Sequence, residues 1–364
     1  MAKLPEPVYE HSTAQAIVKW YDKQNDDPRP HLGASEIGKP CDRALWYSFR
    51  WATKKQFEGR IKRLFQTGHR EEARFLEELR GIGCEIYDRD PETNQQHRFS
   101  AVDGHFGGSC DAIGRGFPEA PKSWAIAEFK THGDKSFTEL KAKGVEKSKP
   151  EHYAQMQVYM GLAELDRALY LACNKNTDEL HSEWIHFDKE VFAALIERAK
   201  HIIGSDTPPQ KLSEDPAWYQ CKFCDHQAVC HQQKVPQKNC RTCAFSSPTQ
   251  NAAWECGVHD KQLDHATQMT GCSKHLFIPP LIPFGEPIDS GEGFVLYQSK
   301  SGQSKFANVA EDAKLPDDYD AQTIACYTSE ELPHMKAALI DDANLTELKA
   351  TFDAKLVESD DIPF

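Results

Sequence analysis

Runs of apolar residues separated by polar turns predict an alternation of helices and strands along the first two thirds of the chain. Short apolar stretches of strand length follow residue 83, and longer stretches with helical periodicity lie on either side of them. We expect strands at 84–88, 97–103, 107–114, 123–131, 168–173 and 183–187. We expect helices at 10–24, 36–51, 64–81, 151–164 and 188–204. This order predicts an α/β core built around a mixed central sheet.

The last third of the chain is organised differently. Residues 236–280 are rich in Cys and His, and prolines around residue 280 mark a boundary. Beyond it, residues 293–297 and 305–309 predict a β-hairpin within a small α+β element. We therefore expect four parts, which are residues 1–235, 236–280, 281–357 and a short acidic end, 358–364.

Composition narrows the class of protein. Hydrophobic residues make up 39% of the chain and charged residues 27%, which suits a soluble globular protein. No stretch approaches about 18 consecutive apolar residues, and the start of the chain lacks the charged and apolar regions of a signal peptide. We therefore expect a cytoplasmic protein that is not associated with a membrane.

The net charge of −13 is concentrated near the end of the chain. Residues 311–364 hold 14 acidic and 4 basic residues, so the rest of the chain is close to neutral. Two basic runs, at 54–63 and 141–149, flank the candidate site described next. Their side chains could follow the phosphates of a nucleic acid, or they could form an ordinary solvated surface.

Three charged residues supply candidate chemistry. Asp111 comes first, and Glu128 and Lys130 follow in the predicted strand 123–131. Residues two apart in a strand point to the same face, so Glu128 and Lys130 share one face while Phe129 points into packing. Carboxylates on one face suit Mg²⁺ or Mn²⁺. An ammonium group beside them can orient a water molecule or offset charge on a phosphate.

The order of these residues resembles that of the PD-(D/E)xK nucleases. The helix expected at 151–164 adds Gln155 and Tyr159, which lie four residues apart on one helical face. Asp, then Glu-x-Lys, then Gln-x-x-x-Tyr is similar to the RecB-like branch, which includes phage exonucleases and CRISPR-adaptation exonucleases. The resemblance covers residues 31–235 and implies a PD-(D/E)xK core of restriction-endonuclease-like fold. It also implies that the Gln/Tyr pair lies beside the metal site and contacts DNA.

The metal site needs a further ligand, and the helix expected at 64–81 offers two candidates. His69 and Glu72 are three residues apart, so they project side by side. The resemblance implies a helix with a Gly-x-x-x-His or Gly-His-x-x-Glu type of pattern, in which either side chain can hold the metal. Both residues therefore stay candidates, and a histidine on a helix surface is the alternative interpretation of His69.

The resemblance implies phosphodiester hydrolysis. The implied ligands of one or two divalent ions are Asp111, Glu128, the Phe129 carbonyl, and His69 or Glu72. The ions would activate water, bind the scissile phosphate and stabilise the leaving oxygen. Lys130 would position the water or neutralise the transition state, while Gln155 and Tyr159 would orient the lysine and the DNA.

Clustered cysteines in a cytosolic chain predict metal binding rather than disulfides. Cys221, Cys224 and Cys230 form a C-x2-C-x5-C cluster that is one ligand short, and Cys41 is the natural fourth. One cysteine before the nuclease core and three after it is the arrangement of the iron–sulfur members of the RecB-like branch. The resemblance therefore implies a [4Fe–4S] cluster that closes the nuclease domain, residues 1–235. Structural zinc is the alternative, which C-x2-C spacing alone favours.

Residues 236–280 hold a second cluster. A C-x2-C pair is followed by two further cysteines, which is typical of a zinc ribbon or knuckle. The candidate ligands are Cys240, Cys243, Cys256 and Cys272, with His259 or His275 as substitutes. The module is too small and polar to hold a core without a metal, so we expect Zn²⁺. A second iron–sulfur cluster and unliganded thiols are the alternatives.

The last residues resemble the C-terminal tip of bacterial single-stranded-DNA-binding proteins. They are Asp360, Asp361, Ile362, Pro363 and Phe364, preceded by Glu358 and Ser359. The Phe364 ring would fill an apolar pocket while its carboxylate meets a basic rim, and the acidic neighbours would add long-range attraction. We expect this tip to dock on proteins that read it; an ordinary acidic tail is the alternative.

Together these features predict a metal-dependent DNA exonuclease of phage recombination or DNA repair. Its implied partners are DNA, proteins that bind the single-stranded-DNA-binding tip, and a strand-annealing protein, in the cytoplasm of a bacterial host if the chain is phage-encoded. The alternative is a non-catalytic DNA-binding protein that mimics the tip to recruit or block host repair enzymes. The presence of Asp111, Glu128 and Lys130 argues against this alternative, because a pure binding protein does not need all three.

Overall fold

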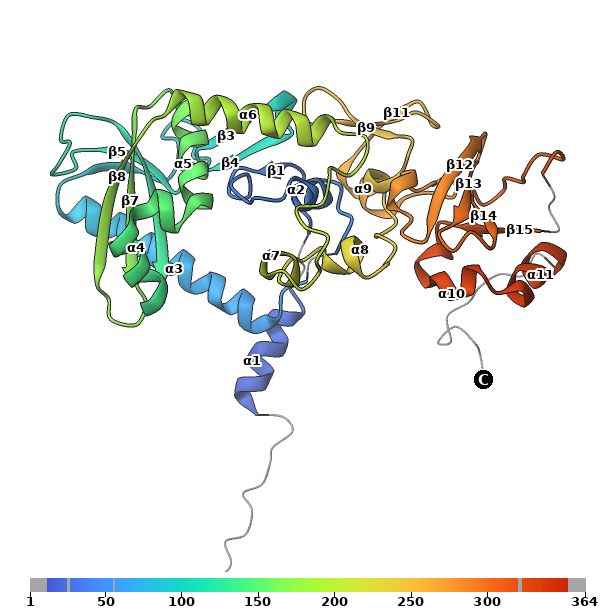
Figure 1. Cartoon of the computed structure of the whole chain (residues 1–364). Helices are drawn as coiled ribbons and strands as arrows, with labels where there is room; N and C mark the ends of the chain where they lie inside the picture. Colours follow the sequence, from blue (N-terminus) through green and yellow to red (C-terminus); the bar gives the residue numbers. More distant parts are fainter. Residues whose placement is uncertain (1–11, 25–26, 55, 320–322, 353–364) are drawn as a thin grey trace, which may run out of the picture. The chain divides into compact units, whose positions relative to one another are not determined.

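The computed structural model describes residues 12–24, 27–54, 56–319 and 323–352 (Figure 1). Two units are distinguished by their internal packing, and each is assembled from separated stretches of chain. Unit 1 comprises Met1–Pro28, Lys55–Phe99 and Gly108–Ala193, and unit 2 comprises Arg29–Lys54, Ser100–Gly107 and Ala194–Phe364. The expected division into consecutive domains at 235, 280 and 357 stays a prediction. Helices and several sheets together make this a mixed α/β protein.

The centre of unit 1 is a mixed five-stranded sheet in the order β2-β5-β6-β7-β8. Its strands are β2 (Glu85–Tyr87), β5 (Ala112–Arg115), β6 (Ala125–His132), β7 (Arg167–Asn174) and β8 (Leu180–His186). The pair β6 and β7 is parallel, with Glu128 beside Tyr170, and the other neighbouring strands are antiparallel. Most side chains of β6 and β7 are buried, as expected for strands covered on both faces. The mixed sheet expected from the sequence is therefore present.

Helices cover the two faces of this sheet. The helices of unit 1 are α1 (Thr13–Asp22), α3 (Gly59–Gly81), α4 (Asp134–Ser148) and α5 (Pro150–Ala163). The buried stripe of α3, with Phe75 and Leu79, packs on the sheet face that carries Phe129. Helices α4 and α5 contact the same central strands from the opposite face, as can be followed in Figure 1. Proline at the first helical position helps to start α5, because its missing N–H would have no partner there.

Two predicted elements were wrong in part. The strand expected at 107–114 is two strands, β4 (Phe106–Ser109) and β5, which belong to different sheets. The chain breaks at Asp111, whose carboxylate takes over the Phe129 N–H from the backbone ladder. The helix expected at 36–51 is limited to α2 (Asp42–Phe49), because the residue before Pro40 is disfavoured in helical conformation.

Unit 2 combines short elements around the cysteines with a sheet nearer its C-terminal end. The short elements are β1 (Leu32–Gly33), α2, η1 (Val102–Gly104), α7 (Tyr219–Lys222), α8 (Gln227–His231), η2 (Cys240–Thr242), β9 (Ser246–Pro248), β10 (Trp254–Cys256), β11 (Lys261–Leu263), α9 (His265–Thr270) and η3 (Pro279–Leu281). β9, β10 and β11 form a small antiparallel sheet, and β1 pairs in parallel with β4. β3 (Arg98–Ala101), β4 and α6 (Lys189–Gly204) each begin in one unit and continue in the other.

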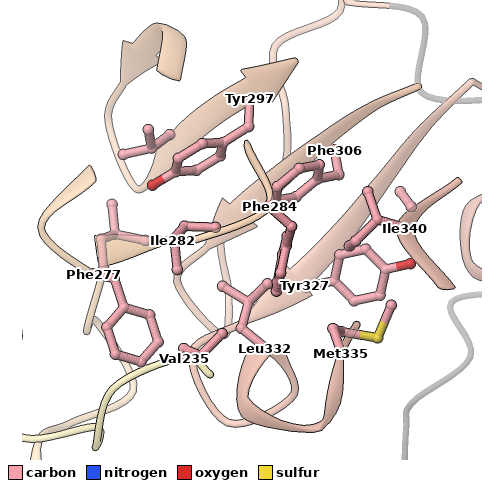
Figure 2. Packing of buried hydrophobic residues seen from close by; sticks show 13 residues of the cluster. Val235, Phe277, Ile282, Phe284, Tyr297, Phe306, Tyr327, Leu332, Met335 and Ile340 are labelled. Atoms are coloured by element: carbon pink, nitrogen blue, oxygen red, sulfur yellow. The ribbon is translucent and has the colours of Figure 1, made fainter. Parts of the chain in front are cut away.

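The C-terminal sheet of unit 2 has an aromatic core. Its strands, in spatial order, are β12 (Gly285–Gly291), β13 (Phe294–Ser299), β14 (Lys305–Val309) and β15 (Ile324–Thr328), followed in the chain by η4 (Leu332–His334), α10 (Ala337–Ile340) and α11 (Ala343–Phe352). Figure 2 shows the buried side chains, among which the rings of Tyr297 and Phe306 stack 5.1 Å apart. β13 and β14 form the predicted hairpin, and the element is α+β as expected.

None of the helices in the described part of the chain is long and apolar enough to cross a lipid bilayer.

Candidate functional site

The three residues predicted to carry catalysis meet in unit 1. Side chains alternate along β6 as predicted, because Phe129 packs against Phe75 in the core, with ring centroids 5.2 Å apart. Asp111 precedes β5, and its Oδ2 accepts a hydrogen bond from the Phe129 N–H at 2.7 Å. The Lys130 ammonium group donates to the Glu128 carboxylate and lies 3.8 Å from Asp111 Oδ2. The two carboxylates and the lysine therefore form one cluster.

Glu128 is the most deeply buried of these three charged residues. Its side chain is completely buried, and its Oε2 atom has no hydrogen-bond partner among the described residues. Burial raises the pKa of Glu128 to about 7, and the charge of Asp111 adds to this rise while Lys130 opposes it. Burial alone would lower the pKa of Lys130, but the charges of Glu128 and Asp111 outweigh burial and raise it. A buried carboxylate with an unused oxygen, next to a second carboxylate, is unfavourable, and a cation would relieve it.

Of the two candidate ligands on helix α3, Glu72 rather than His69 interacts electrostatically with Asp111 and Glu128. Glu72 is half-buried, and its pKa is raised first by burial and then by the charge of Asp111. Glu72 in turn contributes to the raised pKa of Glu128, so the three carboxylates lie within electrostatic reach of one another. His69 is exposed and acts on Glu72, whose pKa it lowers. Glu72 is therefore the better placed of the two predicted ligands.

These oxygen atoms suit a divalent cation chemically. The donor set would be Glu72, Asp111, Glu128 and the Phe129 carbonyl, all hard oxygens of the kind that Mg²⁺ prefers. Within the described residues, however, no group of three or more His, Cys, Asp or Glu side chains is arranged to hold a metal ion. At the carboxylate cluster, the Lys130 ammonium group contacts Glu128 and lies 3.1 Å from the Phe129 carbonyl oxygen. The lysine thus satisfies one Glu128 oxygen and approaches the Phe129 carbonyl, which are two of the oxygens in this donor set.

Helix α5 places Gln155 and Tyr159 beside Glu128. Gln155 Nε2 donates a hydrogen bond to Tyr159 Oη at 3.2 Å, and both side chains are buried. Burial, followed by the charge of Glu128, raises the pKa of Tyr159 well above its usual value. A Cβ atom at Gly108 would come within 2.6 Å of the Tyr159 hydroxyl, so the close packing here requires glycine. The Gln/Tyr pair therefore adjoins the carboxylates, while its contact with DNA stays a prediction.

Sequence reasoning missed three residues on the same face of the sheet. His132 continues the alternation of Glu128 and Lys130 along β6, and its Nε2 lies 2.8 Å from Tyr170 Oη. His152 Nδ1 lies 2.9 Å from the same hydroxyl. The alternation of β6 could have identified His132. Tyr170 could not have been identified, because its position depends on the register between β6 and β7.

The four cysteines of the first predicted cluster all lie in unit 2 and influence one another electrostatically. None of the twelve cysteines forms a disulfide. Burial raises the pKa values of Cys221, Cys224 and Cys230, and the charge of Cys41 adds to each of these rises. Cys41, far away in sequence at the start of α2, therefore lies within electrostatic reach of the other three. The described residues do not hold three or more of these thiols in an arrangement for a metal ion, so the iron–sulfur cluster and its zinc alternative stay predictions.

The cysteines of the second predicted cluster also lie in unit 2 and influence one another electrostatically, although the described residues show no group of three or more arranged to hold a metal ion. The predicted ligands are Cys240, Cys243, Cys256 and Cys272. Burial raises the pKa of Cys240, and the charges of Cys272 and Cys256 add to it. Burial raises the pKa of Cys243 to about 11, although backbone N–H groups of Phe245 and Leu276 donate to its sulfur and oppose this rise. Such N–H donors stabilise the thiolate form that a metal requires.

The two candidate histidines of this module differ. His259 Nε2 lies 3.5 Å from Cys272 Sγ, close to the proposed ligands. His275 is buried, and its Nε2 lies 3.0 Å from the Asn239 carbonyl oxygen, to which it can donate. His259 is therefore the better candidate for a substitute ligand.

The predicted docking tip, Asp360, Asp361, Ile362, Pro363 and Phe364, lies outside the described residues.

Comparisons with known proteins give distant similarities. No protein-family model matches the chain, and no curated protein matches it. Among solved structures, SSO0001 is similar at 15% identity and a TM-score of 0.36, over 61% of this chain and 98% of that one. The alkaline exonuclease LHK-Exo from Laribacter hongkongensis is similar at 16% identity and a TM-score of 0.35, over 48% of this chain and 87% of that one. A phage-related exonuclease from Haemophilus somnus 129PT is similar at 16% identity and a TM-score of 0.33, over 47% and 91%. Similarities this distant carry no argument about function, so the proposal below rests on the residues of unit 1.

Proposed function

We propose that this chain is a divalent-metal-dependent deoxyribonuclease that hydrolyses phosphodiester bonds at the cluster of Asp111, Glu128 and Lys130. The observation that carries the proposal is the completely buried Glu128, which lies next to a second carboxylate and has one oxygen without a hydrogen-bond partner in the part of the chain that the structure describes. Apolar residues at these positions would give an equally or more stable sheet, because burying ion pairs is costly. Perturbed buried charges of this kind are typical of catalytic sites.

The residues have separable roles in this proposal. The oxygens that would hold Mg²⁺ or Mn²⁺ are those of Glu72, Asp111, Glu128 and the Phe129 carbonyl, with His69 as the alternative from α3. A bound metal ion would lower the pKa of water and stabilise charge on the phosphate. Lys130, once released from Glu128, would offset the charge that develops on the phosphate oxygens. Gln155 and Tyr159 would hold the Glu128 side of the site in place through their mutual hydrogen bond.

Within this class we favour an exonuclease of phage recombination or DNA repair, as the sequence resemblance implies. The proposed accessory groups are a [4Fe–4S] cluster at Cys41, Cys221, Cys224 and Cys230, and Zn²⁺ at Cys240, Cys243, Cys256 and Cys272. Residues 358–364 would dock on proteins that recognise the single-stranded-DNA-binding tip. A strand-annealing protein is the partner expected for the single-stranded product.

The test is cleavage of end-labelled linear DNA, single- and double-stranded, with Mg²⁺ or Mn²⁺. Glu128→Gln should lower the cleavage rate by about 100-fold or more, because it removes a charge at the reacting centre. Glu179→Gln changes an exposed glutamate of unit 1 and serves as the matched control, with unchanged cleavage expected. Equal rates for Glu128→Gln and the unmodified protein would refute the site assignment.

Two further arms separate the finer proposals. A covalently closed circular duplex should resist cleavage if the enzyme needs an end, whereas an endonuclease would cut it. Metal-loaded protein that binds DNA without cutting any substrate would favour the non-catalytic binding protein instead. Recovery of partner proteins with the full chain, compared with a chain lacking Phe364, tests the tip; equal recovery would end that part of the proposal.

A further inference from the structure

A hydrogen-bonded network of three aromatic rings lies on the sheet face that carries Glu128 and Lys130. The Tyr170 hydroxyl lies 2.8 Å from His132 Nε2 and 2.9 Å from His152 Nδ1. The far side of His132, at Nδ1, lies 3.2 Å from the hydroxyl of Ser136. The three ring centroids are 5.8 to 6.3 Å apart, so the rings form a compact triangle. His132 and Tyr170 are buried, whereas His152, in the first turn of α5, is half-buried.

This network adjoins the proposed nuclease site. Tyr170 pairs with Glu128 in the register of β6 and β7, and burial followed by the charge of Glu128 raises the pKa of Tyr170. His152 is three residues before Gln155 on α5, so the stripe of side chains that reaches Glu128 begins at His152. The positive charge of Lys130 also acts on His152. The network and the carboxylate cluster therefore share one neighbourhood within unit 1.

Both histidines are held in the neutral form. Burial lowers the pKa of His132 to about 4, and the positive charges of Lys149, Lys130 and Lys175 add to this shift. Burial lowers the pKa of His152 to about 3, with further contributions from Lys130, His132 and Lys149. Each ring therefore carries one proton at neutral pH, and the surrounding charge is the kind that attracts an anion.

The single hydroxyl proton of Tyr170 restricts where the ring protons can be. If Tyr170 donates to His152 Nδ1, then His132 donates to Tyr170 and accepts from Ser136, and His152 carries its proton on Nε2. If every bond is reversed, His152 Nε2 is a bare acceptor. His152 Nε2 is the ring nitrogen of the network that has no hydrogen-bond partner in the described part of the chain. The network thus leaves His152 Nε2 available to a ligand, and the hydrogen bonds of Tyr170 and His132 determine whether this nitrogen carries a proton.

We propose that His152 Nε2 donates a hydrogen bond to a DNA phosphate neighbouring the scissile one, with Tyr170 and His132 fixing its proton. This inference rests on the proposed nuclease function and adds a substrate-binding residue to it. The lysine charges favour an anionic ligand. Because an anion accepts hydrogen bonds, it favours the arrangement of protons in which His152 Nε2 carries the proton and donates. His152 is the contact in this arrangement, while Tyr170 and His132 are positioning residues.

The first experiment compares His152→Leu, His152→Gln and Tyr170→Phe in cleavage of linear DNA. Removing a hydrogen bond to a charged oxygen should lower kcat/KM about 10- to 100-fold in His152→Leu. His152→Gln should restore part of this loss, because its amide nitrogen can replace Nε2 as a donor. Tyr170→Phe should cause a smaller loss, because the ring stays in place and only the fixed proton position is lost. His186→Gln, an exposed histidine of β8, is the control and should leave kcat/KM unchanged.

The second experiment identifies the phosphate. A series of duplexes, each with one uncharged methylphosphonate near the labelled end, is cleaved by the unmodified protein and by His152→Leu. At one position the methylphosphonate should slow cleavage by the unmodified protein about 10-fold or more. The same methylphosphonate should not slow cleavage by His152→Leu any further. Full activity of His152→Leu, or an activity loss that is the same at every methylphosphonate position, would overturn the inference.

Binding of the same duplexes in Ca²⁺ separates this inference from the proposed function. Protein that binds DNA in Ca²⁺ but cuts none in Mg²⁺ or Mn²⁺ would refute the nuclease proposal. The dependence of His152→Leu on one methylphosphonate position would then still appear in the Kd values and support the phosphate contact. Protein that neither binds nor cuts DNA would overturn both. Thermal unfolding of each variant shows whether an effect on cleavage comes from misfolding instead. If His152→Leu is misfolded, the kcat/KM of Tyr170→Phe tests the inference in its place.

Discussion

Replacing Lys130 with methionine keeps the length of the side chain but removes the charge that Glu128 and Asp111 share. The variant would bury Glu128 next to Asp111 without a counter-charge, although Oε2 already has no hydrogen-bond partner among the residues described. Breaking a buried ion pair in this way costs about 3–5 kcal/mol. The Lys130 side chain is 24% exposed, so solvent weakens the pair. We therefore expect the free energy of unfolding to fall by about 2–4 kcal/mol at pH 8.

The pH dependence of this loss follows from Glu128. Its pKa is about 7 in the folded protein, above its ordinary value of 4.5. The folded state therefore binds a proton more tightly than the unfolded state, and stability falls as the pH rises from about 4.5 through 7. Removing Lys130 should raise the pKa of Glu128 further, so Glu128 is neutral at pH 6 in the variant. The destabilisation should accordingly be smaller at pH 6 than at pH 8.

Amide hydrogen exchange of β6 is the suitable assay, because it reports unit 1 alone. Exchange is measured with EDTA and with Mg²⁺, which should return part of the lost stability if it binds the freed carboxylates. Glu128→Gln combined with Lys130→Met completes a double-mutant cycle, in which the double variant should be more stable than Lys130→Met alone. Lys141→Met, which breaks an exposed ion pair with Glu179, is the control and should cost less than about 1 kcal/mol. A loss below about 0.5 kcal/mol at pH 8 would refute the conclusion that Lys130 neutralises Glu128.

Further predictions concern the cysteines, a buried histidine and the C-terminal core. Cys41→Ser should abolish the brown absorbance of anaerobically purified protein, or its zinc if zinc is the metal, whereas Cys326→Ser should not; visible spectra and metal analysis measure this. Cys243→Ser should lose zinc and lower the Tm, and an unchanged zinc content would contradict the assignment of Cys243 as a ligand. His132, with a folded pKa of about 4, stays neutral on folding, so stability should fall by at most about 3 kcal/mol between pH 6.5 and 4. His132→Gln should remove this part of the pH dependence in urea titrations. Phe306→Ala should cost about 3–5 kcal/mol, because the ring is completely buried against Tyr297; a much smaller change in urea unfolding would contradict the packing in Figure 2.

Local periodicity was sufficient to predict the central part of the site. Alternation along β6 places Glu128 and Lys130 on one face and Phe129 on the other, and the structure confirms this separation. Helical spacing likewise predicts that Gln155 and Tyr159 adjoin, and they are hydrogen-bonded to each other. These relations depend on neighbours within one element, which the sequence specifies directly.

Relations between elements could not be predicted in the same way. The sequence gives no sign that Asp111 interrupts a strand, because the interruption depends on a side-chain bond to Phe129 in the next strand. The triangle of His132, Tyr170 and His152 depends on the register of β6 with β7 and on the packing of α5. Nor does the spacing show that Lys130 contacts the Glu128 carboxylate and the Phe129 carbonyl, because these contacts depend on side-chain rotamers.

The interleaved assembly of unit 2 has a consequence for protein synthesis. Helix α2 buries Leu45, Trp46 and Phe49 in unit 2, yet most of that unit begins at Ala194. On the ribosome these apolar side chains emerge long before the residues that cover them, and they must wait through the synthesis of most of unit 1. Truncation after Ala193 would likewise release unit 1 together with an uncovered α2. The order of synthesis therefore makes the early segment a site where chaperones are needed and where shortened chains would aggregate.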